Sequence, residues 1–173
     1  MTDLATLANI AEILGALTIL GGAIFAVFQI REFRAQRRQA AAVELIRSFH
    51  DTELARAVNL MQRLPDGIPA DELRSKGPEY EHAAVMISTT YETIAFLVFR
   101  DMASFSMVRE LTGGLAIVMW RKLARWSDSV RQEQAQPSWA EWFQWLAEQL
   151  ARESEQKEAH PAYERFANWR PRR

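Results

Sequence analysis

The sequence predicts an all-α protein in which one N-terminal transmembrane helix continues into a cytoplasmic helical bundle. Three observations lead to this prediction: an uncharged apolar run near the N-terminus, apolar residues at three- and four-residue spacing farther along, and no segment with a period of two. The length of 173 residues suits one domain and an anchor. We expect an anchor at 1–30, a juxtamembrane helical stalk at 31–64, the bundle at 65–158 and an irregular basic tail at 159–173.

The composition excludes several classes of protein. Hydrophobic residues make up 49% of the chain and charged residues 25%, as in ordinary globular proteins, and the mean hydropathy of -0.21 argues against a polytopic membrane bundle. The net charge of -1 provides no basic field, so we do not expect nucleic acid as a partner. The chain has no cysteine, which excludes disulfides and thiolate metal sites and fits a reducing compartment.

The run from Ile13 to Ile30 contains no charged residue. As a helix it would extend about 27 Å, close to the roughly 30 Å thickness of the hydrocarbon layer of a bilayer. Glu12 precedes the run, and we expect it at headgroup level rather than as a functional acid within the membrane. A cleaved signal peptide is the alternative, but its basic residues would precede the apolar run, whereas here they follow it.

Four arginines follow the apolar run and predict its orientation: Arg31, Arg34, Arg37 and Arg38. Basic residues close to the end of a span stay on the cytoplasmic side of the membrane. We therefore expect the N-terminus on the outer side of the membrane and the C-terminal domain in the cytoplasm. The bilayer is its first expected partner, because arginine side chains at this position contact anionic lipid headgroups.

Small residues in the span predict self-association. Ala11 and Gly15 form one pair at four-residue spacing, and Thr18, Gly22 and Ala26 continue with the same spacing. Such a face allows two helices to approach closely in lipid. The alternative is that glycine and alanine are simply common in membrane spans. We expect a homo-oligomer or a larger membrane complex.

The remaining chain has the pattern of helices separated by turns that contain proline and glycine. The segment from Arg31 to Phe49 lacks both residues and is rich in strong helix formers, so the span should continue into the stalk. Apolar residues at helical spacing extend the stalk to Leu64, with a new helical start at Asp51 or Thr52. Further helices are expected at 78–102, 104–130 and 139–151, with at most a short helix at 71–76.

The segment from Ala83 to Phe99 is apolar enough to be considered as a second span. However, it holds polar residues from Ser88 to Thr93 at its centre, where lipid tolerates them least. We therefore expect a buried helix of a soluble bundle. In the last helix, we expect Trp139 and Trp142 in the core and Trp145 at an interface.

Glu79 and His82 have the Glu-x-x-His spacing of di-iron sites in four-helix bundles. Such a site needs a second copy of the motif, and neither His50 nor His160 completes one. Nor does the chain contain a glycine-rich phosphate loop, a zinc-binding spacing or a Ser-His-Asp set. We therefore expect no metal, no cofactor and no catalytic residue.

Glu92 is the most unusual polar residue, because it stands in an otherwise apolar helix. Arg100 lies two turns farther along a similar face, and the sequence predicts a buried polar pair between the two. The alternative is that Glu92 binds a ligand or handles a proton. An enzyme that uses Glu92 together with His82 is the least favoured of these possibilities.

The block from Ala11 to Ile46, AEILGALTILGGAIFAVFQIREFRAQRRQAAAVELI, resembles the start of bacterial proteins of the DUF4760 type. In those proteins one N-terminal span ends in an Ile-Arg pair and a helix rich in glutamine and alanine follows. The pair Tyr91-Glu92 and the tryptophan-rich last helix also fit. The resemblance implies a bacterial membrane-anchored helical protein and carries over no activity. With the orientation predicted above, it implies a bacterial inner-membrane protein with a periplasmic N-terminus and a cytoplasmic C-terminal domain.

Together these observations predict a non-enzymatic, single-pass inner-membrane protein. It would assemble with itself, or act as an accessory or scaffold subunit of a membrane complex through its cytoplasmic helical domain. The alternative is a ligand-responsive oligomeric membrane effector or channel.

Overall fold

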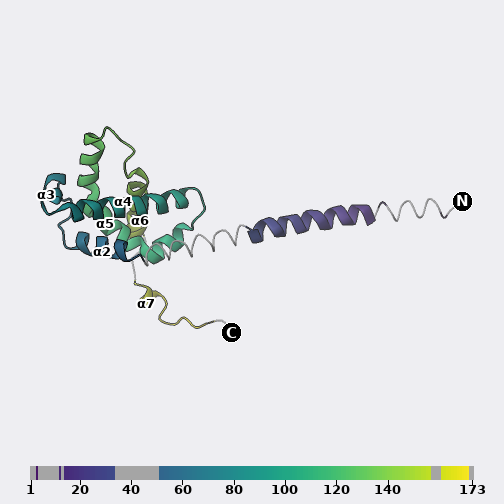
Figure 1. The fold of residues 1–173 in the computed structure, drawn as a ribbon. Helices are drawn as coiled ribbons and strands as arrows, with labels where there is room; N and C mark the ends of the chain where they lie inside the picture. The colour runs from purple at the N-terminus through teal and green to yellow at the C-terminus, as the bar shows by residue number, and fades with distance from the viewer. Residues whose placement is uncertain (1–2, 4–11, 13, 34–50, 157–160, 172–173) are drawn as a thin grey trace. The chain divides into compact units, whose positions relative to one another are not determined.

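A computed structural model of the chain describes residues 3, 12, 14–33, 51–156 and 161–171 (Figure 1). Within these ranges every regular element is a helix, which confirms the all-α prediction. The chain divides into two compact units, Met1–Val43 and Glu44–Arg173. Each unit is described separately below.

The first unit contains an apolar helix, Leu14–Phe33, that coincides with most of the predicted span. None of its 20 residues is buried. Leu14–Phe33 and a second helix, Pro78–Phe99, are both long and apolar enough to cross a membrane. An apolar N-terminal helix is thus confirmed.

The second unit contains six helices in its described part, and they are α2 (Thr52–Gln62), α3 (Ala70–Ser75), α4 (Pro78–Phe99), α5 (Phe105–Glu133), α6 (Glu141–Gln156) and α7 (Ala162–Arg165). Helix α4 packs against both α2 and α6, α6 also packs against α5, and the short α3 contacts α4 and α5 (Figure 1). The helical bundle is therefore organised around α4.

Helix α4 begins and ends at residues that favour these boundaries. Pro78 occupies the first turn, where its missing N–H costs nothing. The helix ends three residues before the predicted Met102, because Asp101 adopts a left-handed conformation with φ 54°. The N–H groups of Met102 and Ala103 both donate to the carbonyl oxygen of Leu97, at 2.9 and 3.1 Å, and close the end of the helix.

The core joins α4, α5 and α6 through aromatic residues. The rings of Tyr91 and Phe143 stack with their centroids 4.8 Å apart, and the Tyr91 hydroxyl lies 2.7 Å from the Thr112 hydroxyl oxygen. Eight residues of α4 are buried, which makes α4 a core helix of the bundle: Ala83, Ala84, Ile87, Ser88, Tyr91, Ile94, Ala95 and Val98.

Helix α2 belongs to the bundle rather than to a separate stalk. Its residues Leu54, Ala57 and Met61 are buried in the common core. The Nζ of Lys122 on α5 donates to the Leu64 carbonyl oxygen, and so fixes the chain directly after α2. The predicted stalk at 31–64 is therefore wrong at its C-terminal end, and its residues 34–50 lie outside the described part.

Asp51 begins α2 as expected, since its side chain accepts a 2.8 Å hydrogen bond from the N–H of Glu53. Helix α5 runs without interruption through Gly113 and Gly114. A Cβ atom on Gly113 would lie 3.3 Å from Cδ2 of Leu150, so the missing side chain allows α6 to approach α5 closely.

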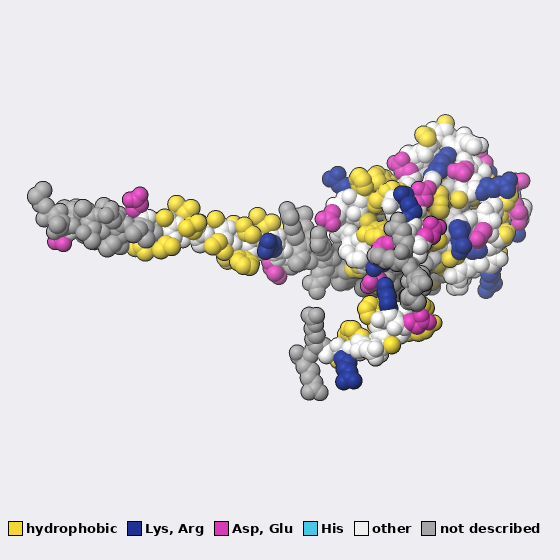
Figure 2. Space-filling view, turned by 180° about the vertical axis from the view of Figure 1, so that it is seen from behind, with side chains coloured by type: hydrophobic (Ala, Val, Ile, Leu, Met, Phe, Trp, Pro, Cys, Tyr) yellow, Lys and Arg dark blue, Asp and Glu magenta, His cyan; other side chains and the backbone are white. Residues whose placement is uncertain are grey.

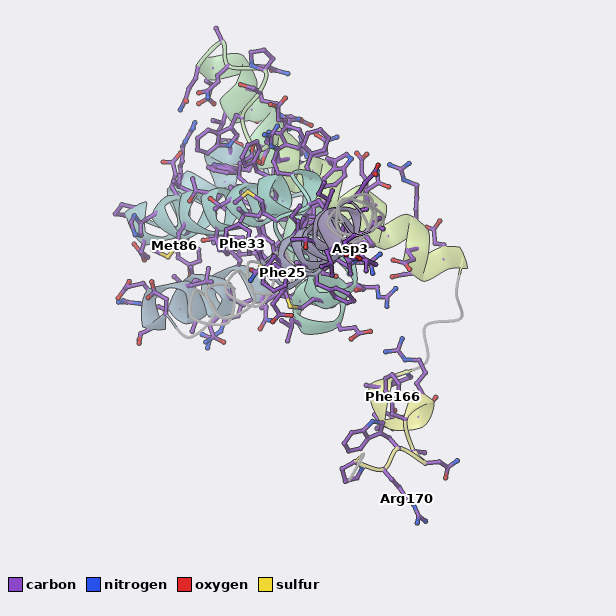
Figure 3. All side chains as sticks on the ribbon, turned by 90° about the vertical axis from the view of Figure 1, so that its right-hand side faces the viewer. Asp3, Phe25, Phe33, Met86, Phe166 and Arg170 are labelled. Carbon is purple, nitrogen blue, oxygen red and sulfur yellow. The ribbon has the colours of Figure 1, made fainter. Side chains whose placement is uncertain are left out.

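The predicted irregular tail at 159–173 contains one short helix, α7, within its described residues. Figure 3 shows Phe166 directly after α7 and Arg170 farther along the chain. The guanidinium carbon of Arg165 lies 4.8 Å from the centroid of the Phe166 ring, a local cation–π contact. All described residues of this tail are exposed.

Candidate functional site

The first candidate site is the surface of the Leu14–Phe33 helix. Figure 2 shows hydrophobic side chains along its visible face. Its exposed large hydrophobic residues are Leu14, Leu17, Ile19, Leu20, Ile24, Phe25, Val27, Phe28, Ile30 and Phe33. Covering such side chains with apolar surroundings gains about 1.5–3 kcal/mol each, which is a strong drive toward lipid or a protein partner.

The small residues predicted to mediate self-association lie on this helix, except Ala11, which is outside the described residues. Gly15, Thr18, Gly22 and Ala26 follow one another at spacings of three, four and four residues and share one face. A Cβ atom on either glycine would meet nothing within 4 Å. This face is therefore open to the approach of another helix.

Two polar features of the helix suit a membrane environment. The Thr18 hydroxyl donates to the Leu14 carbonyl oxygen at 2.8 Å, so this hydroxyl already has a partner within its own helix. Arg31 is exposed close to the C-terminal end of the helix. The other predicted headgroup contacts, Arg34, Arg37 and Arg38, lie outside the described residues.

The second candidate site is formed by Glu92. Its Oε2 accepts a 2.8 Å hydrogen bond from the backbone N–H of Phe143, and the backbone N–H of Trp142 also bonds to the carboxylate. These two residues lie in the first turn of α6, where N–H groups have no partner inside the helix. Glu92 thus caps α6 from α4.

The groups around Glu92 shift its pKa in opposite directions. Burial raises the pKa of Glu92, and the hydrogen bonds from Phe143 and Trp142 lower it. The charge of Glu141 raises this pKa further, whereas the charge of Arg131 lowers it. The net result is a pKa above the ordinary value for glutamic acid.

The predicted buried pair of Glu92 and Arg100 is wrong. The two residues are eight positions apart, which places them about 12 Å apart along a helix axis. Arg100 caps the C-terminal end of α4 and is exposed. Only the structure reveals the true partner, because α6 begins at Glu141 rather than at the predicted Trp139. Ala140, a residue type that cannot cap a helix with its side chain, then precedes the first turn.

A cavity of about 180 Å³ lies beside Glu92. It is lined by Ser88, Thr89 and Glu92 of α4 and by Gln136, Ser138, Trp139 and Ala140 from the segment before α6. Among the described residues, Ser88 Oγ and Trp139 Nε1 are buried and have no hydrogen-bond partner. Unpaired polar groups next to a carboxylate are suited to binding water or a small polar molecule.

Arg131 fixes the wall of this cavity. Its Nε donates to the Trp139 carbonyl oxygen at 2.8 Å, and its guanidinium carbon lies 6.0 Å from the centroid of the Trp120 ring. The segment that closes the cavity is therefore anchored to α5.

Glu79 and His82 lie apart from this cavity, beside Glu53 and Arg56 of α2, where they line a depression of about 110 Å³. In the described part of the chain, no group of three or more His, Cys, Asp or Glu side chains is arranged to hold a metal ion. Within this part of the chain, Glu79 and His82 therefore lack the additional ligands that a di-iron site needs.

The third candidate site is a cluster that we call the aromatic patch, made of Phe96, Phe99, Phe105, Trp142 and Trp145. The Phe99 ring centroid lies 4.5 Å from that of Trp142 and 6.0 Å from that of Trp145. Phe96 contacts Trp142 edge-on at 5.8 Å. Phe105 joins the patch by lining, with Phe99 and Trp145, a shallow depression of about 360 Å³.

The three tryptophans of the last helical segment have the same degree of burial and differ in their neighbours. Trp139 packs edge-on against the buried Trp126, with centroids 6.2 Å apart, on the core side as expected. Trp142 is, like Trp139, partly buried and packed against the core, and its ring also belongs to the aromatic patch. Trp145 is also partly buried.

Residues 16–150 match the protein family described as a domain of unknown function, DUF4760. No curated protein and no solved structure matches the chain. The matched range includes most of the Leu14–Phe33 helix and the bundle from α2 into α6.

Proposed function

This chain belongs to the DUF4760 family, and we propose that it is a single-pass bacterial inner-membrane protein without enzymatic activity. It assembles with itself, or acts as an accessory or scaffold subunit of a membrane complex, through its cytoplasmic helical domain. The observation that carries the proposal is the Leu14–Phe33 helix, which is apolar, 20 residues long and entirely exposed. A helix satisfies its own backbone hydrogen bonds, so lipid can cover these side chains directly.

The orientation follows from the charges at the two ends of the helix. Asp3 and Glu12 precede it, and Arg31 begins the basic cluster that includes Arg34. The excess of arginine on one side supports a cytoplasmic position for the bundle.

Self-association is supported by the face of Gly15, Thr18, Gly22 and Ala26. In lipid, helix association depends on close packing, because hydrophobic side chains gain nothing by leaving the acyl chains. A face of small residues provides that close packing. The Thr18 hydroxyl on this face already has a hydrogen-bond partner within its own helix.

The test compares two glycine variants of the full chain, extracted in mild detergent. Gly22→Leu places a large side chain on the small-residue face, whereas Gly21→Leu places the same side chain one position away from it. Mass measurement should show an oligomer for the native chain and for Gly21→Leu, and a loss of the oligomer for Gly22→Leu. A native chain that is monomeric and co-purifies with no other protein contradicts the proposal. Release of the chain from membranes by alkaline carbonate contradicts the membrane anchor itself.

The cavity beside Glu92 favours a second candidate function, a ligand-responsive membrane effector or channel. A molecule that hydrogen-bonds to the Glu92 carboxylate would compete with the N–H groups of α6 and so alter the position of that helix. This function predicts ion flux in liposomes that contain the full chain, and a changed flux for Glu92→Gln. Absence of flux in both preparations contradicts it.

A further inference from the structure

The aromatic patch is an exposed apolar surface at one end of the bundle. It combines the last turns of α4, the first residue of α5 and the first half of α6. Phe96 is 44% exposed and Phe99 54% exposed, although both rings contact tryptophan. Aromatic rings that are packed together and still exposed are typical of a surface that binds lipid or another protein.

The chain itself limits what can cover this surface. If Leu14–Phe33 spans the bilayer, as proposed above, residues 34–50 are all that separates this helix from the start of the bundle at Asp51. A segment of this length reaches at most about 60 Å, even when fully extended. The start of the bundle therefore stays within that distance of a lipid surface.

The composition of the patch also favours lipid. Tryptophan and phenylalanine are well suited to the interface of a bilayer, because they combine a large apolar surface with rigid rings. Arg100 follows Phe99 directly and is exposed, and arginine side chains are attracted to anionic lipid headgroups. The adjacent Asp101 is exposed as well, so the margin of the patch is polar.

We propose that the aromatic patch of Phe96, Phe99, Phe105, Trp142 and Trp145 lies in the headgroup interface of the bilayer that holds the N-terminal helix. The shallow depression beside Phe105, which Val98 and Gln149 also line, receives the upper part of an acyl chain. This inference rests on the proposed membrane anchor. It adds a second contact with lipid, made by the folded bundle.

The absence of native cysteine allows the contact to be measured with single labels. Gln149→Cys places a fluorophore at the margin of the depression without removing an aromatic ring. Gln132→Cys is the matched control, because it replaces an exposed glutamine about 40 Å along α5 from Phe105. Each labelled full chain is placed in nanodiscs of phosphatidylethanolamine and phosphatidylglycerol, with or without brominated acyl chains.

Brominated lipid should quench the label at 149 and leave the label at 132 unchanged. Addition of Phe99→Asp to the Gln149→Cys chain should abolish the quenching. Phe99 is more than half exposed, so the fold should tolerate this change, and unchanged helix content by circular dichroism confirms it.

Equal quenching at 149 and 132 would overturn the inference, as would quenching at 149 that persists in Phe99→Asp. Energy transfer between labels at 149 on different copies, without quenching by brominated lipid, would show a contact between copies and would also overturn it. A label at Phe25→Cys separates the two proposals. Quenching at 25 without quenching at 149 refutes only the proposed contact of the aromatic patch with lipid. Absence of quenching at 25 refutes the proposed membrane anchor.

Discussion

Glu92 connects two helices whose bonded residues are 51 positions apart in the chain. From the sequence alone, a carboxylate in an apolar helix suggests a cationic side chain as its partner, and Arg100 was the nearest candidate. The actual partners are backbone N–H groups at the start of α6, whose partial positive charge stabilises a carboxylate in the same way. Nearly every residue has a backbone N–H group, so a search of the sequence for charged side chains does not identify these partners.

The cap formed by Glu92 predicts a graded effect of two substitutions. Glu92→Ala leaves the N–H groups of Trp142 and Phe143 without their acceptor and should lower the stability by about 1–2 kcal/mol. Glu92→Gln keeps an acceptor oxygen in the same place and should lower it less. Thermal unfolding of the full chain in detergent, followed by tryptophan fluorescence, measures both. Equal stability of the alanine variant and the native chain would contradict the capping role.

The raised pKa of Glu92 predicts how the stability difference between Glu92→Gln and the native chain depends on pH. Because burial raises the pKa of Glu92, the folded protein holds the proton more tightly than the unfolded chain does. The resulting stabilisation is complete below the ordinary glutamate pKa of about 4.3 and is lost as the pH rises through the raised value. Glu92→Gln has no such proton. The melting temperature of Glu92→Gln should therefore rise relative to the native chain between acidic and neutral pH, and a constant difference would contradict the shift.

Tyr91 and Thr112 form a buried hydroxyl pair whose energy can be isolated. Burial raises the pKa of Tyr91 to about 12, so the phenol stays protonated at physiological pH. Tyr91→Phe leaves the Thr112 hydroxyl without this partner and should cost about 1–2 kcal/mol. Thr112→Val in the same chain should recover part of that loss, because both hydroxyl groups are then absent. Denaturant unfolding of both single variants and the double variant measures the coupling, and strictly additive effects would contradict it.

The helices of the bundle were largely predictable from the sequence, but their neighbours were not. Pro78 predicted the start of α4, and Asp51 the start of α2, because proline and aspartate act through local backbone geometry. The apolar spacing of Leu54 and Met61 also predicted a helix. Spacing shows that a helix has a face to bury, but not which other helix covers it. The place of α2 in the core therefore had to come from the structure.

The two adjacent glycines of α5 predict opposite responses to the same substitution. At Gly114 an added Cβ meets nothing within 4 Å, so Gly114→Ala should gain up to about 1 kcal/mol from helix propensity. At Gly113 the Cβ would lie 3.3 Å from Leu150, so the strain against α6 should cancel or reverse that gain. Chemical denaturation of the two variants makes the comparison. A larger gain for Gly113→Ala than for Gly114→Ala would contradict the close approach of α5 and α6.

At the scale of the whole molecule, the chain combines an exposed apolar helix with a bundle that has its own core. The sequence predicted this division because an uncharged run and an amphipathic pattern differ in composition. It did not predict the cavity or the aromatic patch. The cavity depends on the middle of α4 lying beside the segment before α6, and the patch on the end of α4 lying beside the start of α6. Only the folded chain defines these neighbours.

The proposed orientation predicts the accessibility of two engineered cysteines. Thr2→Cys should react with a membrane-impermeant maleimide added to intact cells whose outer membrane has been made permeable, because the N-terminus is proposed to face the periplasm. Ser154→Cys, at the end of α6, should react only after the inner membrane is disrupted. Both should react fully in detergent, which serves as the control. Reaction of Ser154→Cys before the inner membrane is disrupted would show that the orientation is the opposite of the one proposed.

The hydrogen bonds from α6 to Glu92 also have a consequence for folding during synthesis. During synthesis α4 leaves the ribosome before α6, so for a time the nascent chain holds the Glu92 carboxylate without its amide donors. Without α4, the N–H groups of Trp142 and Phe143 lack their acceptor on Glu92. A chain that stalls before Glu141 therefore leaves one side of α4 uncovered, as a target for chaperones and proteases.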